Sequence, residues 1–422
     1  MEKINRNQLF LASCVALTVT SMTFAIRAGM LGQLGIDFGL TTTQLGYITG
    51  TAFWGFPLAI IIGGALVDTI GMRKLMYGAF ACHILGIILT ITAGGFWGLF
   101  ISTLLIGIAN GLVEAVCNPL IASMYPENKT TKLNHFHIWF PGGLVIGGLV
   151  AYFLGQAGIG WQIQMATMLI PAVIYGFLFW GKTFPVTERV AKGISTGEMY
   201  KALGKPLFIV LVICMLGIAV TELGTNQWIG LLLGSVTDNA LLLLVFISAI
   251  MAFGRSIAAP IVHRFSPAGL LTISAFISAV GLYLLATLSG NMLFVAAGIF
   301  AVGVTYFWPT MLGFVAEYTP KTGAVGMSLA GGAGVFAMAI FSPIMGAMYD
   351  SNIAEGLPEG ADITAYQKAV SGTAEAAQYA AAELTAGPDI LETMVFIPIF
   401  LIFVFAGLFF YTRNMKQGTL EY

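Results

Sequence analysis

The residues best suited to chemistry lie in the stretch "ANGLVEAVCNPL", at positions 109–120. Asn110, Glu114 and Asn118 are spaced four residues apart, which places them on one face of a helix. A carboxylate accepts hydrogen bonds and an amide both donates and accepts them, so this face offers what a polyol needs. A lone carboxylate can also exchange a proton. We predict a solute-binding stripe with Glu114 as its ionisable group; the alternative is that the three residues tie their helix to a neighbour.

The composition is that of a membrane protein. Of 422 residues, 58% are hydrophobic and only 9% are charged, whereas soluble proteins average about 25% charged residues. We therefore expect the lipid bilayer to be the solvent. The net charge of −1 offers no basic face for nucleic acid. The cysteines lie in apolar runs without metal-ligand spacing, as expected of small core residues: Cys14, Cys82, Cys117 and Cys214.

Twelve runs are long enough to cross a bilayer as helices, which takes about 20 apolar residues each. The predicted spans are 8–34, 43–67, 73–96, 97–124, 133–155, 161–181, 206–234, 238–262, 267–289, 291–316, 324–349 and 391–412. The expected fold class is an all-α membrane protein of twelve transmembrane helices. The predicted parts are a six-helix bundle at 1–183, a linker at 184–205, and a second bundle at 206–422 with a long outer loop at 351–391.

A weak internal repeat suggests that the two halves are pseudo-symmetric. Pro119 and Pro309 are 190 residues apart, and the glycine pairs at 142–143 and 331–332 are 189 apart. In each half, a proline of the fourth span thus precedes a double glycine of the fifth. Many secondary transporters are built from two such repeats around a central site.

Lysine and arginine set the expected orientation, because they concentrate in cytoplasmic loops. With the N-terminus inside, the cytoplasmic side collects 16 of the 18 basic residues. They are Lys3, Arg6, Arg73, Lys74, Lys129, Lys132, Lys182, Arg189, Lys192, Lys201, Lys205, Arg255, Arg264, Lys321, Arg413 and Lys416. The outer loops receive only Lys368, and Arg27 lies within the first span. Both termini are therefore predicted to be cytoplasmic.

The outer segment at 351–391 differs from every other loop. It contains "TAEAAQYAAAELTAG", an alanine-rich stretch that favours a helix, and several acidic residues. We expect a solvated helical spacer; a lid or a partner-binding segment is the alternative.

The stretch "GGALVDTIGMRK" resembles the glycine–acid–glycine–basic loop motif of the major facilitator superfamily. The matching residues are Gly64, Asp68, Gly71, Arg73 and Lys74. Small glycines let two helices approach, and an acid at the cytoplasmic rim can pair with basic groups. We predict that Asp68 and Arg73 take part in gating. The second half keeps a degenerate counterpart, "GRSIAAPIVHRF".

A narrower resemblance is to the fucose:proton symporter family. It rests on "VEAVCNPL" in span four, "KLNHFHIWFPGG" in span five, "FWPTMLG" in span ten and "SPIMGAMYD" in span eleven. The resemblance implies transport of hexoses or related sugars with protons across the plasma membrane, the inner membrane of a bacterium. It implies that Glu114 couples transport to the ion and that Asn134 belongs to the site. In span one, where the fucose symporter has an acid, this chain has Arg27 in "FAIRAGML".

Three ionisable residues, Arg27, Glu114 and Glu222, lie well inside spans that line the central cavity in this superfamily. Such residues usually face a cavity or a partner. Depths counted at about 1.5 Å per residue favour an Arg27–Glu222 pair across the halves on the outer side, which would leave Glu114 free to titrate. A shift of one helical turn would instead pair Arg27 with Glu114. We further predict that Asn226 and Trp308 contact a sugar through an amide and an aromatic ring.

The expected function is therefore symport of a small polar solute, most plausibly a hexose, with protons by alternating access. Sodium coupling and an organic anion bound by Arg27 are the alternatives within transport; a non-transporting membrane sensor is the alternative outside it. The Gly-x-x-x-x-Gly-Lys loop of nucleotide-driven pumps does not occur in the sequence. We expect no enzymatic activity, no cofactor beyond the transported ion, and a monomer whose partners are its solute and the bilayer.

Overall fold

The computed structural model describes residues 4–40, 42–233, 240–367, 369–413 and 415. Every regular element within these ranges is helical. Eleven helices of the described chain are long and apolar enough to cross a membrane. The segments Leu243–Ser256 and Ala258–Arg264 meet at 66° and would form a twelfth span together. The predicted all-α membrane class is confirmed.

The first half contains eight helical segments that correspond to the first six predicted spans. They are α1 (Arg6–Phe38), α2 (Thr42–Ile70), α3 (Met72–Ile91), α4 (Phe96–Met124), α5 (Lys129–Phe136), α6 (Trp139–Gln156), α7 (Trp161–Ala166) and α8 (Leu169–Phe179). The chain between the halves forms two short helices, α9 (Glu188–Ala191) and α10 (Thr196–Leu203).

The second half is more interrupted. It comprises α11 (Pro206–Ala219), a π-helical turn (Val220–Gly224), α12 (Thr225–Leu233), α13 (Ala240–Ser256), α14 (Ala258–Arg264), α15 (Pro267–Thr287), α16 (Met292–Val304), α17 (Phe307–Tyr318), a 3-10 turn (Pro320–Thr322), α18 (Gly323–Glu355), α19 (Ile363–Gln367), α20 (Ala374–Met394) and α21 (Phe396–Thr412). Glu222 lies in the π-helical turn, a type of helix defect that often occurs at functional sites.

Pro141 and Pro309 each lie just after a break between two helical segments. Proline has no backbone N–H, so it leaves the carbonyl four residues before it without a helical donor. Pro141 thereby frees the carbonyl of His137 between α5 and α6, and Pro309 frees that of Thr305 between α16 and α17. Each of these two interruptions therefore leaves a backbone carbonyl that a donor from elsewhere can use.

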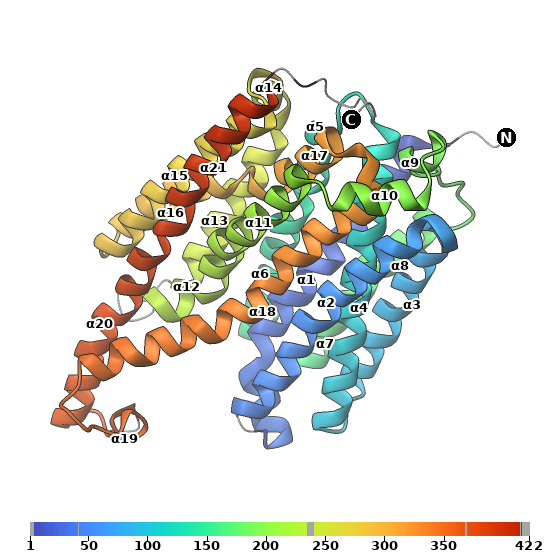
Figure 1. The fold of residues 1–422 in the computed structure, drawn as a ribbon. Coiled ribbons are helices and arrows are strands. Elements are labelled where there is room, and N and C mark those ends of the chain that lie inside the picture. The colour runs from blue at the N-terminus through green and yellow to red at the C-terminus, as the bar shows by residue number, and fades with distance from the viewer. Residues whose placement is uncertain (1–3, 41, 234–239, 368, 414, 416–422) are drawn as a thin grey trace.

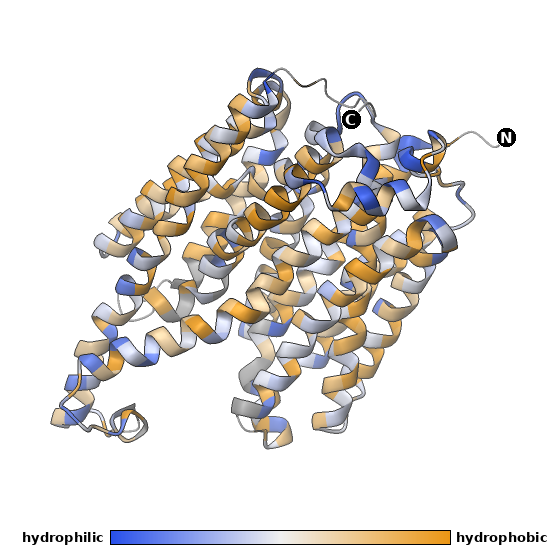
Figure 2. Ribbon diagram, viewed as in Figure 1, coloured by the Kyte–Doolittle hydropathy of each residue, from blue (hydrophilic) through white to orange (hydrophobic). Residues whose placement is uncertain are grey.

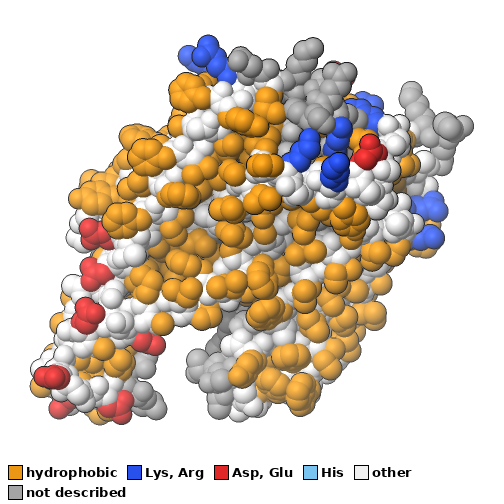
Figure 3. All heavy atoms as spheres, in the orientation of Figure 1, with side chains coloured by type: hydrophobic (Ala, Val, Ile, Leu, Met, Phe, Trp, Pro, Cys, Tyr) orange, Lys and Arg blue, Asp and Glu red, His pale blue; other side chains and the backbone are white. Residues whose placement is uncertain are grey.

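The two halves pack closely at the end where α1 begins and α21 ends (Figure 1). Glycines allow this approach across the halves: a Cβ on Gly64 of α2 would collide with Ser328 of α18, and one on Gly313 of α17 would collide with Thr130 of α5. At the opposite end the halves are separated, and Figure 3 shows a wide gap between them. The molecule is thus closed at one end and open at the other.

The segment after α18 forms an arm beside this opening, in which α20 packs against α18 (Figure 1). Asn352 donates a hydrogen bond to the carbonyl of Ala386 at 3.3 Å, and Tyr349 donates to Glu383 at 3.5 Å. The predicted alanine-rich helix is present as α20 and runs almost directly into α21. The role of the arm as a spacer or lid stays a prediction.

The surface carries its charge at its two ends. Apolar residues cover the helices between them (Figure 2), while lysine and arginine gather at the closed end and acidic residues along the arm (Figure 3). This distribution agrees with the predicted orientation, which stays a prediction; Lys3, Lys368 and Lys416 lie outside the described residues. One assignment needs correction: Arg255, counted with the basic residues of the cytoplasmic side, is only 1% exposed and lies in the interior.

Candidate functional site

A cavity of about 390 Å³ lies between the two halves. Both halves contribute to its wall, and the lining is mostly aromatic and aliphatic. The lining residues are Phe24, Ala25, Arg27, Thr49, Ala52, Phe53, Phe56, Phe140, Leu144, Leu223, Asn226, Leu244 and Val335. A buried cavity of this size with few polar groups is the usual form of a small-molecule site.

A second, smaller cavity of about 30 Å³ adjoins the first and contains the acidic groups. Phe56, Phe140, Leu223 and Val335 line both cavities. The small cavity adds the side chains of Glu114, His137, Glu222, Arg255 and Trp308. The two spaces form one site. We call the larger, mostly apolar cavity the upper chamber and the smaller, charged cavity the floor.

Arg27 belongs to the upper chamber and is 5% exposed. Among the described residues it forms no ion pair, and its buried Nη2 has no hydrogen-bond partner. The predicted pair between Arg27 and Glu222 does not form. The reason is that Glu222 is neutralised by a different arginine, which comes from its own half.

That arginine is Arg255 of α13, whose Nη2 donates to Glu222 Oε1 at 3.0 Å. Its Nε donates to the carbonyl of Thr305 at 2.7 Å, and its Nη1 donates to the carbonyl of His137 at 2.9 Å. These are the carbonyls that Pro309 and Pro141 leave without a helical donor. Arg255 therefore connects Glu222 and the carbonyl of Thr305, both in the second half, to the carbonyl of His137 in the first half.

Glu114 of α4 is 3% exposed and is held by its own helix. Asn118 donates from Nδ2 to Glu114 Oε2 at 2.5 Å, and His137 Nε2 lies 3.0 Å from Asn118 Oδ1 and 4.0 Å from Glu114 Oε2. With His137 donating, this is a chain of donors that ends on the carboxylate. Glu114 thus lies in the floor as an acid without an arginine in hydrogen-bond contact among the described residues.

Asn110 has a different environment. Its Oδ1 lies 2.9 Å from His83 Nε2, and its Nδ2 donates to Thr23 Oγ1 at 3.0 Å. His83 Nδ1 is in turn 2.8 Å from the Tyr175 hydroxyl. Both polar atoms of the Asn110 side chain therefore connect α4 to α3 and α1. This agrees with the alternative prediction, in which the polar face of the helix binds neighbouring helices.

The remaining predicted solute contacts divide between the cavity and the closed end. Asn226 lines the upper chamber and Trp308 the floor. Asn134 lies outside both cavities: its Nδ2 donates to the carbonyl of Thr130 at 3.0 Å and to Thr310 Oγ1 at 3.3 Å, the latter across the halves. It therefore contributes to closure of this end.

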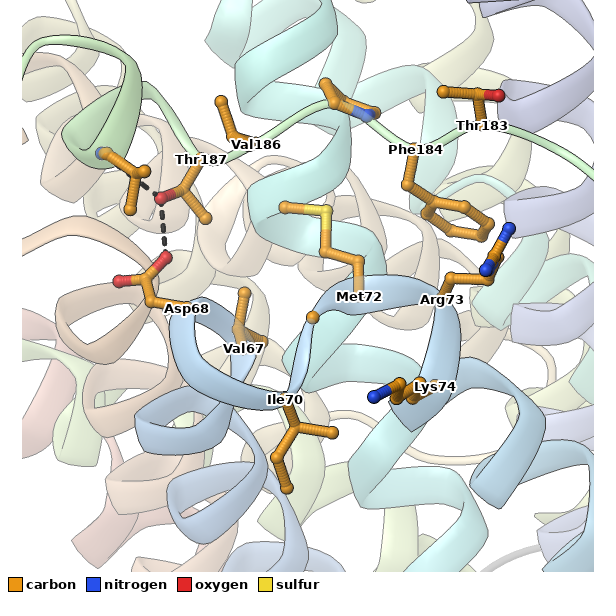
Figure 4. Close-up of a pocket in the computed structure, with 13 residues that line it drawn as sticks. Val67, Asp68, Ile70, Met72, Arg73, Lys74, Thr183, Phe184, Val186 and Thr187 are labelled. Carbon is orange, nitrogen blue, oxygen red and sulfur yellow. Dashed lines mark hydrogen bonds between the residues drawn. The ribbon is translucent and has the colours of Figure 1, made fainter.

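The loop motif forms part of the closed rim. Asp68 Oδ1 accepts from Thr187 Oγ1 at 2.6 Å, and Asp68 Oδ2 accepts from Arg189 Nε at 2.9 Å, both from the inter-half chain. Gly71 has φ +90°, which glycine tolerates best, and so turns α2 into α3. Arg73 lines a pocket of about 370 Å³ here, on the far side of Met72 from Asp68 (Figure 4).

Lys129 provides a second rim contact. Its Nζ donates to Glu188 Oε2 at 2.6 Å and to the carbonyl of Ala316 in the second half at 3.2 Å. Partial burial alone would raise the pKa of Glu188, but hydrogen bonds and ion pairs with Lys129 and Lys192 outweigh this effect and lower the pKa. Lys129 thereby links the inter-half chain to the first bundle and the first bundle to the second.

Sequence reasoning missed two floor residues, Arg255 and His137. Arg255 is counted with the cytoplasmic basic residues, because these usually mark the inner ends of spans, and His137 lies in the stretch quoted from span five without a predicted role. The available signal was the position of Pro141 and Pro309, each four residues after a carbonyl that needs another donor.

In the described part of the chain, six candidate spans in each half, with the bent pair counted as one, surround a central cavity, an arrangement that many secondary transporters share. The profile of the Major Facilitator Superfamily matches residues 9–342. The chain belongs to this superfamily. The superfamily resemblance that the loop motif indicated is confirmed, while gating by Asp68 and Arg73 stays a prediction.

Curated relatives are distant. The myo-inositol transporter 1 of Candida albicans is 24% identical over 207 residues, which cover 46% of this chain and 36% of that protein. A probable chloroplastic anion transporter 6 of Arabidopsis thaliana is 25% identical over 176 residues, 37% of this chain and 34% of that protein. The chain spans about a third of the length of these relatives.

Solved structures share the fold over most of the chain. The proton:xylose symporter XylE superposes with a TM-score of 0.70 at 16% identity, covering 90% of this chain and 94% of XylE. The fucose:proton symporter FucP of E. coli superposes with a TM-score of 0.67 at 14% identity, covering 93% and 98%. At these identities the likeness concerns the fold.

Proposed function

We propose that this protein is a proton-coupled symporter of a small solute of the sugar class, which works by alternating access. The observation that carries the proposal is the position of Glu114. It is a buried acid in the floor of the cavity between the halves, bonded to Asn118 and close to His137. An ionisable group at this depth is costly to bury and is usually functional.

The asymmetry of the molecule supports alternating access. The end that carries Asp68, Lys129 and Asn134 is held together by contacts between the halves and with the inter-half chain. The opposite end is open (Figure 3). We expect the positive-inside orientation, with the closed end cytoplasmic, so this conformation would receive solute from outside the plasma membrane.

The hydrogen bonds around Glu114 favour a proton over sodium. Asn118 directs its NH₂ group at the carboxylate, and its Oδ1 is used by His137. A sodium site would need oxygen ligands in these positions. Protonating Glu114 weakens the carboxyl group as an acceptor for Asn118, adds an O–H donor and removes a negative charge from the floor, so the floor can rearrange when the proton arrives.

The sugar class is supported by the transported solutes of relatives and fold neighbours and by the groups in the site. Several of these proteins are named as transporters of inositol, glucose, xylose or fucose. In this chain Asn226 offers an amide for hydroxyl groups, and Trp308 with the phenylalanines of the chamber offers apolar faces for a ring.

The test is transport in proteoliposomes with a sugar panel, driven by a pH gradient or by a sodium gradient. We expect accumulation with the pH gradient alone. Glu114→Gln mimics the protonated acid, so it should keep solute exchange at equal pH but lose accumulation. Accumulation that follows sodium would replace the proton in the proposal. Absence of flux with every solute and gradient would overturn the transport proposal.

A further inference from the structure

We infer that the upper chamber binds the carboxylate of its solute through Arg27, so that the transported compound is a sugar acid or a similar polyhydroxylated carboxylic acid. This inference rests on the proposed function and specifies its substrate. The observations behind it are which charged side chains facing the cavity have a partner and which do not.

The first observation is the isolation of Arg27. A buried guanidinium normally has a carboxylate partner or several acceptors, because an unpaired buried charge is expensive. Arg27 is 5% exposed, has no ion pair among the described residues, and leaves its buried Nη2 without an acceptor. The partner that this guanidinium lacks is an anion, and the cavity beside it has room for one.

The second observation is that the acids of the floor have other partners. Glu222 is paired with Arg255 at 3.0 Å, and Glu114 accepts from Asn118 at 2.5 Å. Neither acid lines the upper chamber, where Arg27 is the single charged side chain among the described lining residues. The positive charge of the chamber therefore remains available to a solute.

The third observation concerns the rest of the solute. Asn226 lines the chamber from the second half, and its buried Oδ1 has no hydrogen-bond partner, so it can accept from a hydroxyl group. Phe24 packs near Phe53, Phe56 and Phe140, with ring centroids 5.8–6.4 Å apart, and this cluster offers an apolar face. A carboxylate, hydroxyl groups and a C–H face together describe a sugar acid.

One arginine also distinguishes a carboxylate from a phosphate ester. A phosphate carries nearly two negative charges at neutral pH and generally recruits several cations or amides. The lining offers a single guanidinium, which matches a single carboxylate.

The arrangement also explains how an anion would be coupled to a proton. With Glu114 ionised and His137 neutral, the charges of Arg27, Arg255, Glu114 and Glu222 cancel. A proton on Glu114 leaves one positive charge in excess, which a carboxylate then balances. Binding of the proton and of the anion therefore favour each other, and the loaded cavity is neutral before it changes sides.

Binding to the purified protein tests the inference without relying on transport. The probes are D-glucuronate and D-glucose, which differ at C6 in carboxylate against hydroxymethyl, together with the matched pair D-galacturonate and D-galactose. Ligand-dependent stabilisation gives the affinity in each case. We expect at least one acid to bind about tenfold or more tightly than its neutral sugar, as for one charge-assisted hydrogen-bonded contact.

Variants locate the site. Arg27→Gln should abolish that preference while changing affinity for the neutral sugar less than about threefold, and Arg27→Lys should keep part of it. Arg6→Gln is the matched control, because Arg6 is an exposed arginine at the start of the same helix. It should leave the preference unchanged. If Arg27→Gln does not fold, the wild-type preference and Arg27→Lys decide.

The outcomes separate the two proposals. Equal or tighter binding of the neutral sugars, no binding of either acid, or an unchanged preference in Arg27→Gln would overturn the carboxylate site even if a sugar is transported. Preferential binding of an acid without any flux in proteoliposomes would support the carboxylate site and overturn the transporter proposal.

Discussion

Arg255 of the second half donates a hydrogen bond to the backbone carbonyl of His137 in the first half, at 2.9 Å. The acceptor exists because Pro141 removes the helical donor that would otherwise use it. A backbone carbonyl does not titrate, so a change of pH does not remove this acceptor. Whether the hydrogen bond forms depends on how the two halves are placed relative to one another. It has to break or be rebuilt whenever the halves move apart at this level.

Arg255 should therefore be needed for both stability and turnover. Arg255→Gln leaves Glu222 buried without its counter-ion, which we expect to cost about 3–5 kcal/mol of unfolding free energy. Adding Glu222→Gln removes the stranded charge and should restore a large part of the thermal stability. Transport should stay impaired, because the double variant still lacks the guanidinium that joins the halves. Thermal unfolding in detergent and flux in proteoliposomes measure the two effects. Full recovery of flux would show that Arg255 serves only as a counter-ion.

The prolines should matter through the carbonyls that they free. Pro141→Ala gives residue 141 an N–H group that competes with Arg255 for the carbonyl of His137. We expect a loss of about 1 kcal/mol, the usual net value of one hydrogen bond, together with slower transport. Pro343→Ala is the matched control, because Pro343 also lies inside a helix but is exposed. Equal flux in Pro141→Ala and wild type would contradict the role assigned to the freed carbonyl.

Two asparagines four residues apart should behave differently. Asn110→Ala leaves His83 and Thr23 without their partner and should destabilise the protein by about 1–3 kcal/mol without changing solute selectivity. Asn118→Ala removes the donor that holds Glu114 and should instead shift the pH dependence of uptake. Unfolding temperatures and uptake measured across pH distinguish the two. A changed selectivity in Asn110→Ala would return Asn110 to the solute site.

These asparagines also show how far the sequence can predict the site. Periodicity placed Asn110, Glu114 and Asn118 on one face of α4, and hydropathy found the spans. A helix face meets several neighbours, however, and only the packing of α3 and α1 reveals that Asn110 is used within the first half. The predicted Arg27–Glu222 pair was wrong for a similar reason. The depth of a residue along its helix does not show in which direction its side chain points. Arg255 was missed because it lies near the end of its helical segment, just before a break of 66°, and charge and hydropathy do not show that its side chain faces the interior.

Glu188 should make the closed rim sensitive to acid. Its pKa is lowered in the folded protein because interactions with Lys129 and Lys192 outweigh the effect of burial. A lowered pKa contributes stability that is present above the unfolded pKa and is lost as the pH falls through the folded pKa. The contribution should be below about 1 kcal/mol, since the pair is partly exposed. Wild type should therefore unfold at a higher temperature than Glu188→Gln at pH 7, and the difference should begin to shrink as the pH falls below about 4.3, the ordinary pKa of glutamate, and vanish below the lowered pKa of the folded state. A difference that persists unchanged in acid would assign the effect to packing.

Asp68 should hold the rim closed through the inter-half chain. It accepts hydrogen bonds from both Thr187 and Arg189, so Asp68→Asn removes the charge that pairs with Arg189 while keeping the shape. We expect the closed end to open more often, because Arg189 is 5% exposed and loses its carboxylate. An introduced cysteine at Met327, which lines a crevice at this rim, reports the opening. In a background without the natural cysteines, its labelling by a membrane-impermeant maleimide should rise severalfold in Asp68→Asn. Lys74→Gln is the control, because it removes an exposed rim charge that, among the described residues, forms no hydrogen bond or ion pair with the chain between the halves. Unchanged labelling in Asp68→Asn would mean that the contacts of Lys129 and Asn134 suffice to keep this end closed.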